Sequence, residues 1–131
     1  MRFANEVNGL VVKFSRLEVN ETLGVDMLVM ERLYPLDFRA HEAEIREIQF
    51  DVFADELRTL HAAGFAHHDL QRPSNLPGER FDNILLTAQS LRLIDVGISV
   101  LHRQVGEAFF NAYVQRELEE LARFRAFFLG R

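Results

Sequence analysis

Apolar residues follow a helical period in two long segments, and this limits the possible folds more than any other feature of the chain. Between about residues 40 and 63 they recur three and four apart with charges between them, which predicts an amphipathic helix ended by Gly64. A second stripe of this kind runs from about 106 to 128. We expect both stripes to face the core. They consist of Ile45, Ile48, Val52, Phe53, Leu57 and Leu60, and of Phe110, Val114, Leu118, Leu121, Phe124 and Phe128.

Two pairs of short segments with β-forming residues complete the pattern. Residues 9–18 and 25–31 are rich in valine, leucine and phenylalanine, and they predict a hairpin that turns at residues 20–24. Residues 84–87 and 91–95 predict a second, smaller hairpin. The order of hairpin, helix, small hairpin and helix predicts an α+β fold.

Composition narrows the class of protein. A chain of 131 residues with 48% hydrophobic residues can form one packed core, and we expect a single domain over residues 1–131. The net charge of −5, with both signs interspersed, argues against a dedicated nucleic-acid-binding protein. The chain has no cysteine, which excludes disulfides and thiolate metal sites. No apolar run approaches the ~18 residues of a membrane span, so we expect a cytoplasmic protein without a membrane partner.

Three polar motifs follow the first long helix in a fixed order. His67-His68-Asp69-Leu70 stands beyond the helix end, Asn83 precedes the small hairpin, and Asp95-Val96-Gly97 follows it. A carboxylate can accept a proton from a hydroxyl group, and amide and carboxylate oxygens are hard ligands that suit Mg²⁺. Each motif is weak alone, but their order and the position of Asn83 twelve residues before Asp95 are more specific.

This series of motifs resembles the signature of the protein-kinase family, in which an H-R-D-L loop, an asparagine and a D-F-G turn occur in the same order. The resemblance implies that Asp69 is the catalytic base, which orients the acceptor hydroxyl and receives its proton. It also implies that Asn83 and Asp95 hold Mg²⁺ against the phosphates of ATP. Gly97 would allow a sharp turn behind the metal ligand.

The resemblance extends upstream and covers most of residues 8–97. NGLVVKFSRLEV and VDMLVMERLYP look like the fourth and fifth strands of a kinase small lobe and the hinge that follows them. The resemblance makes Met30 the gatekeeper and gives the Glu31 carbonyl and the Leu33 amide contacts with adenine. Leu85 would lie under the base.

The chain is shorter than the family pattern. The resemblance makes residues 1–34 a remnant small-lobe hairpin with its hinge, and residues 35–131 a reduced large lobe. We find no Gly-rich loop. Lys13 is not the strand lysine, because it lies only seventeen residues before the gatekeeper position, too few for the helix and two strands that the family has between them. No A-P-E motif follows Asp95. The missing loop and lysine would hold and polarise the phosphates in the transition state. Each 1.36 kcal/mol of lost transition-state stabilisation lowers the rate about tenfold, so we expect weak activity at best.

The catalytic loop also departs from the signature. Asp69 and Asn83 are fourteen residues apart, whereas the family spacing is about five. Asn75, within the intervening loop, is therefore a rival metal ligand, although Asn83 is favoured because it leads into the strand NILL. Gln71 stands where a basic residue is usual, and His68 where arginine is usual. We therefore expect no basic pocket for a phosphorylated activation loop.

Two functions fit this pattern. The first is an ATP- and Mg²⁺-dependent phosphotransferase of weak activity. The alternative is a pseudokinase-type module that senses a nucleotide or binds a protein without catalysis. In either case we expect the surface left by the missing small lobe to bind a protein partner or a second copy of the chain.

Two other clusters carry weaker signals. His61, His67, His68 and Asp69 could bind a transition metal, but their spacing fits no zinc signature. The acidic residues of the last helix are expected to form a solvated face, namely Glu117, Glu119 and Glu120.

Overall fold

The computed structural model describes residues 1–20, 25–71 and 81–130, and it has the α+β composition expected from the sequence. The strands pair in three antiparallel hairpins or ribbons, β1 with β2, β3 with β6, and β4 with β5. The helices are α1 (Arg2–Val7), α2 (Ala43–Ala63), α3 (His102–Val105) and α4 (Glu107–Leu129). The strands are β1 (Phe14–Asn20), β2 (Val25–Met30), β3 (Phe65–Ala66), β4 (Ile84–Leu86), β5 (Leu91–Leu93) and β6 (Val100–Leu101).

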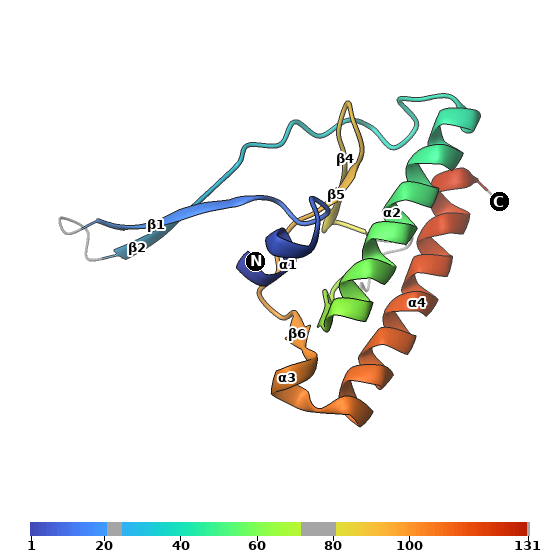
Figure 1. Cartoon of the computed structure of the whole chain (residues 1–131). Coiled ribbons are helices and arrows are strands. Elements are labelled where there is room, and N and C mark those ends of the chain that lie inside the picture. The colour runs from blue at the N-terminus through green and yellow to red at the C-terminus, as the bar shows by residue number, and fades with distance from the viewer. Residues whose placement is uncertain (21–24, 72–80, 131) are drawn as a thin grey trace, which may run out of the picture.

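Helices α2 and α4 lie side by side and antiparallel, and they form the scaffold of the molecule (Figure 1). Both were predicted with nearly these bounds. Helix α2 ends at Gly64, whose φ of 98° lies in the left-handed region that favours glycine. A Cβ atom added there would also lie 3.2 Å from the Cβ atom of His102. None of the helices in the described part of the chain is long and apolar enough to cross a membrane.

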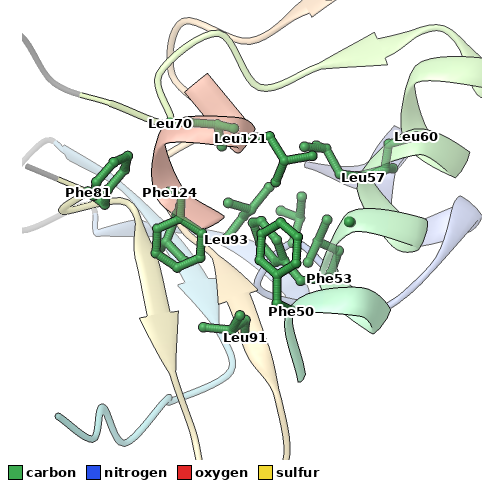
Figure 2. Packing of buried hydrophobic residues seen from close by; sticks show 14 of the residues in the cluster. Phe50, Phe53, Leu57, Leu60, Leu70, Phe81, Leu91, Leu93, Leu121 and Phe124 are labelled. Atoms are coloured by element: carbon green, nitrogen blue, oxygen red, sulfur yellow. The ribbon is translucent and has the colours of Figure 1, made fainter. Parts of the chain in front are cut away.

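Phe124 of α4 lies at the centre of the core, where Figure 2 shows its ring between the helices and the small hairpin. Its ring centroid is 5.7 Å from that of Phe38, 6.3 Å from Phe50, 5.7 Å from Phe53 and 5.1 Å from Phe81. Tilted and edge-to-face contacts at this range stabilise a core beyond simple burial of the rings. The core therefore holds α2, α4 and the β4–β5 hairpin in one arrangement.

The predicted core stripe of α2 is wrong in its first half. Ile45, Ile48 and Val52 are 44%, 65% and 46% exposed, whereas Phe50 and Phe53 are buried. Ile48 and Val52 each lie two residues from Phe50, and two residues in an α-helix correspond to a rotation of about 200°. They therefore face away from the core, although their own spacing is helical.

The first predicted strand, residues 9–18, is divided in two. Strand β1 begins only at Phe14, and the preceding segment runs along β5 instead. The Val12 amide donates to the Leu93 carbonyl at 2.8 Å, and the Leu93 amide donates to the Leu10 carbonyl at 2.8 Å. Residues 10–13, the crossing segment, thus lead the chain from the β4–β5 hairpin to the β1–β2 hairpin.

The two predicted hairpins are both present. Hairpin β1–β2 extends away from the helices (Figure 1) and pairs Phe14 with Met30 at its base. Its predicted turn at residues 20–24 falls largely on residues 21–24, which lie outside the described residues. Hairpin β4–β5 pairs Ile84 with Leu93.

Helix α1, the β3–β6 ribbon and α3 were not predicted. Helix α1 is held by the side chain of Asn5, which donates to the carbonyl oxygens of Val11 at 3.2 Å and Val12 at 3.3 Å. The same side chain accepts the amide of Phe14 at 2.7 Å. A six-residue helix is too short for a periodic signal, and contacts of this kind, remote in sequence, stabilise it.

Candidate functional site

Strand β3 leads from α2 into the loop that carries Asp69. The side chain of His67 stabilises this loop. The imidazole of His67 is fully buried. Its Nδ1 accepts the amide of Asp69 at 3.2 Å, so the ring proton is on Nε2, which donates to the Ile94 carbonyl at 2.7 Å. His67 therefore joins the Asp69 loop to the segment that leads into Asp95.

Glu117 of α4 also stabilises this loop through hydrogen bonds to its main chain. Its Oε1 accepts the amide of His67 at 3.1 Å and its Oε2 accepts the amide of His68 at 2.6 Å. Its Oε1 also lies 2.9 Å from Nε2 of His61. The carboxylate is only 1% exposed, and hydrogen bonds of this kind offset the cost of burying a charge.

The solvated face expected for the acidic residues of α4 is wrong for two of the three. Glu117 and Glu120 are buried, whereas Glu119 is exposed. Glu120 accepts the amide of Gln71 at 2.8 Å, so it also holds the loop after Asp69. A signal was present in the sequence, because Glu117 lies four residues before Leu121 and so falls on the apolar stripe.

His68 adopts an unusual backbone conformation next to Asp69. Its φ of 69° lies in the left-handed region, which costs a non-glycine residue about 1–3 kcal/mol and persists only where neighbouring contacts enforce it. Its ring packs on Tyr113 with centroids 4.4 Å apart, and its Nδ1 lies 3.3 Å from the Ile98 carbonyl. These contacts fix the direction in which the chain presents Asp69.

Asn83 lies directly beside Asp69. Its Nδ2 donates to the main-chain carbonyl of Asp69 and to Oδ2 of the same residue, each at 3.0 Å. The main-chain carbonyl of Asn83 accepts the amide of Ile94 at 2.9 Å. The structure thus brings Asn83 to Asp69 in spite of their fourteen-residue separation in sequence. The rival, Asn75, lies outside the described residues.

Asp95 follows β5 and is exposed. Its φ of 53° is left-handed, and its Oδ1 accepts the amide of Gly97 at 3.3 Å. Gly97 lies in a turn, as expected, and this turn is closed by the Ser99 amide, which donates to the Val96 carbonyl at 3.1 Å. The left-handed conformation, however, is adopted by Asp95 and not by Gly97.

A pocket of about 610 Å³ lies beside Asp95. Its walls include all four residues expected to contact a nucleotide base, Met30, Glu31, Leu33 and Leu85. The remaining lining is mostly apolar and consists of Asp95 together with Met1, Val12, Ile94, Val96 and Gly97. A concave, mainly apolar site with a few polar groups at its edge is the usual form of a small-molecule pocket.

Glu31 fixes one wall of this pocket. Its carboxylate accepts the amide of Lys13 at 2.7 Å and forms an ion pair with Arg92 of β5. The Arg92 guanidinium lowers the pKa of the Glu31 carboxyl, although partial burial acts in the opposite direction. The side chain of Lys13 is exposed.

The histidine cluster is used internally. His61 is bonded to Glu117, and both ring nitrogens of His67 have partners in the main chain. Among the described residues, no group of three or more His, Cys, Asp or Glu side chains is placed to hold a metal ion.

Comparison of the chain with known proteins did not assign it to a family. No protein-family model matches the sequence, and the search of curated proteins found no match.

Proposed function

We propose that the chain binds ATP with Mg²⁺ in the pocket between Leu33 and Asp95, and that it is a reduced protein-kinase-like phosphotransferase of weak activity. One observation carries the proposal. The pocket lined by Met30, Glu31, Leu33 and Leu85 also contains Asp95 and Ile94, and Ile94 donates its amide to the carbonyl of Asn83, which in turn contacts Asp69. Direct contacts between residues far apart in sequence thus connect the pocket to the Asp69 carboxylate.

The base would occupy the apolar part of the pocket. Leu85 on β4 and Val12 on the crossing segment lie in its lining, together with Leu33. The segment from Glu31 to Pro35 has no regular secondary structure, although the Glu31 amide donates to the Lys13 carbonyl at 2.9 Å. Under the proposal the Glu31 carbonyl and the Leu33 amide recognise the edge of the base.

Under the proposal, Asn83 and Asp95 hold Mg²⁺. Because the amide nitrogen of Asn83 points to Asp69, its oxygen is the side-chain atom that remains as a metal ligand. The Asp95 carboxylate is exposed at the edge of the pocket. Mg²⁺ is usually bound by one or two carboxylates together with water and phosphate oxygens, so a larger protein cage is not needed. The bound ion would neutralise charge on the transferred phosphoryl group.

Asp69 would orient the acceptor hydroxyl and receive its proton. Its position is determined by Asn83, by His67 and by the Glu117 carboxylate under the preceding amides. Preorganisation of this kind favours catalysis because the groups need not rearrange when charge develops. The pocket lining has no basic side chain among the described residues, which is consistent with weak phosphate activation.

The lack of a basic side chain among the described residues of the pocket lining also favours a second candidate. This is a pseudokinase-type module that binds a nucleotide or a protein without turnover. Met30, Tyr34 and Leu36 lie on or near the hinge and are 44%, 69% and 40% exposed. Exposed apolar groups that lie close together often mark an interface. Under this proposal a protein partner or a second copy of the chain covers them.

Nucleotide binding and turnover are tested separately. Isothermal titration with ATP, with and without Mg²⁺, measures binding, and transfer of labelled phosphate to water or to the protein itself measures turnover. Binding that requires Mg²⁺, with turnover lost in Asp69→Ala, supports the enzyme. Binding without any turnover in the unsubstituted chain favours the module, and absence of binding at millimolar ATP would refute both nucleotide proposals.

A further inference from the structure

Arg92 connects three segments that meet at the pocket. Its Nε donates to the Leu10 carbonyl at 3.3 Å, and its Nη2 donates to the Val11 carbonyl at 3.2 Å. The same Nη2 forms the ion pair with Oε1 of Glu31. One planar guanidinium thus contacts the crossing segment and the first residue of the hinge.

The strand position of Arg92 places this contact next to Leu85, which forms the pocket floor. Arg92 pairs directly with Leu85 across the β4–β5 hairpin. Successive residues of a strand point to opposite faces, so the neighbours Leu91 and Leu93 face the core and are buried. The side chain of Arg92 is itself only 16% exposed.

The Glu31 carboxylate completes the connection. Its Oε1 accepts both Arg92 and the Lys13 amide, while the Glu31 amide donates to the Lys13 carbonyl at 2.9 Å. Glu31 is therefore bonded to Lys13 by its main chain and its side chain. Loss of Arg92 would leave the main-chain bond but remove the link to β5.

We infer that Arg92 is a positioning residue for the pocket, which sets the distance between the hinge at Glu31 and the floor at Leu85. The nucleotide assigned to this pocket rests on the proposed function, whereas the link itself rests on the contacts above. Arg92 does not line the pocket, so it acts through Glu31 and the crossing segment. Lysine cannot replace it, because a single ammonium lacks the planar set of donors that reaches three acceptors.

The link itself is tested by amide hydrogen exchange of the chain without nucleotide. In Arg92→Gln we expect the amides of Lys13 and Glu31 to exchange at least about tenfold faster, equivalent to about 1.4 kcal/mol of lost protection. The Thr87 amide, bonded to Ser90 at 2.8 Å near the turn of the small hairpin, should be unchanged. Arg58→Gln is the matched control, because Arg58 is exposed and pairs only locally with Asp55. Equal exchange at Lys13 and Glu31 in Arg92→Gln and in the unsubstituted chain would overturn the inference.

Two further measurements distinguish a positioning role from general loss of stability. Glu31→Gln keeps the main-chain bonds of Arg92 and should show the same local increase in exchange without a change at Thr87. If Arg92→Gln does not fold, the outcome for Glu31→Gln decides the inference alone. If the unsubstituted chain binds ATP, Arg92→Lys should weaken binding about tenfold. If it does not bind ATP, the proposed function fails, and the exchange result still decides the role of Arg92.

Discussion

Asn83 donates from one amide nitrogen to both the main-chain carbonyl and the carboxylate of Asp69, each at 3.0 Å. The contact closes the fourteen-residue separation that distinguishes this chain from the kinase spacing. Asp69 itself remains partly exposed. The fourteen-residue separation in sequence therefore does not keep these two side chains apart.

Replacing Asn83 should destabilise the protein. Asn83→Ala removes both hydrogen bonds and leaves polar atoms of Asp69 without this partner, and we expect the free energy of unfolding to fall by about 1–3 kcal/mol. Urea denaturation followed by circular dichroism measures the change. Asn111→Ala is the control, because Asn111 is an exposed residue of α4. Similar losses for the two variants would contradict the role given to Asn83.

Glu117 should matter more for stability than any exposed acid on its helix. Glu117→Gln replaces an oxygen that accepts main-chain amides with a group that donates, and we expect a loss of about 2–4 kcal/mol in the free energy of unfolding. Glu119→Gln, on the same helix but exposed, should change it by less than about 0.5 kcal/mol. Unfolding of the two variants at the same urea concentration would contradict the role given to Glu117.

The Glu31–Arg92 pair predicts a dependence of stability on pH. Arg92 lowers the pKa of Glu31 in the folded protein, so the unfolded chain binds the proton more tightly. The contribution is present above the ordinary carboxyl range and is lost as pH falls through the folded pKa. Between about pH 6 and about pH 3, Glu31→Gln should therefore lose less stability than the unsubstituted chain.

Glu56 provides a test with the opposite sign. Burial raises the pKa of the Glu56 carboxyl, so the folded state binds the proton more tightly than the unfolded chain. This contribution is present at low pH and is lost as pH rises through the folded pKa. Glu56→Gln should therefore make the acid-induced loss of stability steeper, and an equal or shallower loss would contradict the assignment.

The main elements could be predicted because their signals are local. The stripe that includes Phe124 and Phe128 predicted α4, and Gly64 marked the end of α2. The division of residues 9–18 could not be predicted, because it depends on the hydrogen bonds of Leu10 and Val12 with β5, which is distant in sequence. Short elements such as α1 likewise depend on contacts that no local pattern contains.

The candidate site was predicted in part for the same reason. Motif order identified Asp69 and Asn83, and the structure places their side chains in contact. Glu117 was missed because charge was taken as a sign of exposure, although its position on the apolar stripe indicated burial. Arg92 was missed because its role depends on pairing opposite Leu85 and on the crossing segment.

Titration of ATP in the presence of Mg²⁺ into the unsubstituted chain and into Asp95→Ala tests the central claim most directly. The account predicts saturable binding by the unsubstituted chain and at least about tenfold weaker binding by Asp95→Ala. Asp55→Ala, at an exposed position of α2, should bind as the unsubstituted chain does. Absence of binding at millimolar ATP, or equal affinity in Asp95→Ala, would contradict the claim that Asp95 and the adjoining pocket form a nucleotide site.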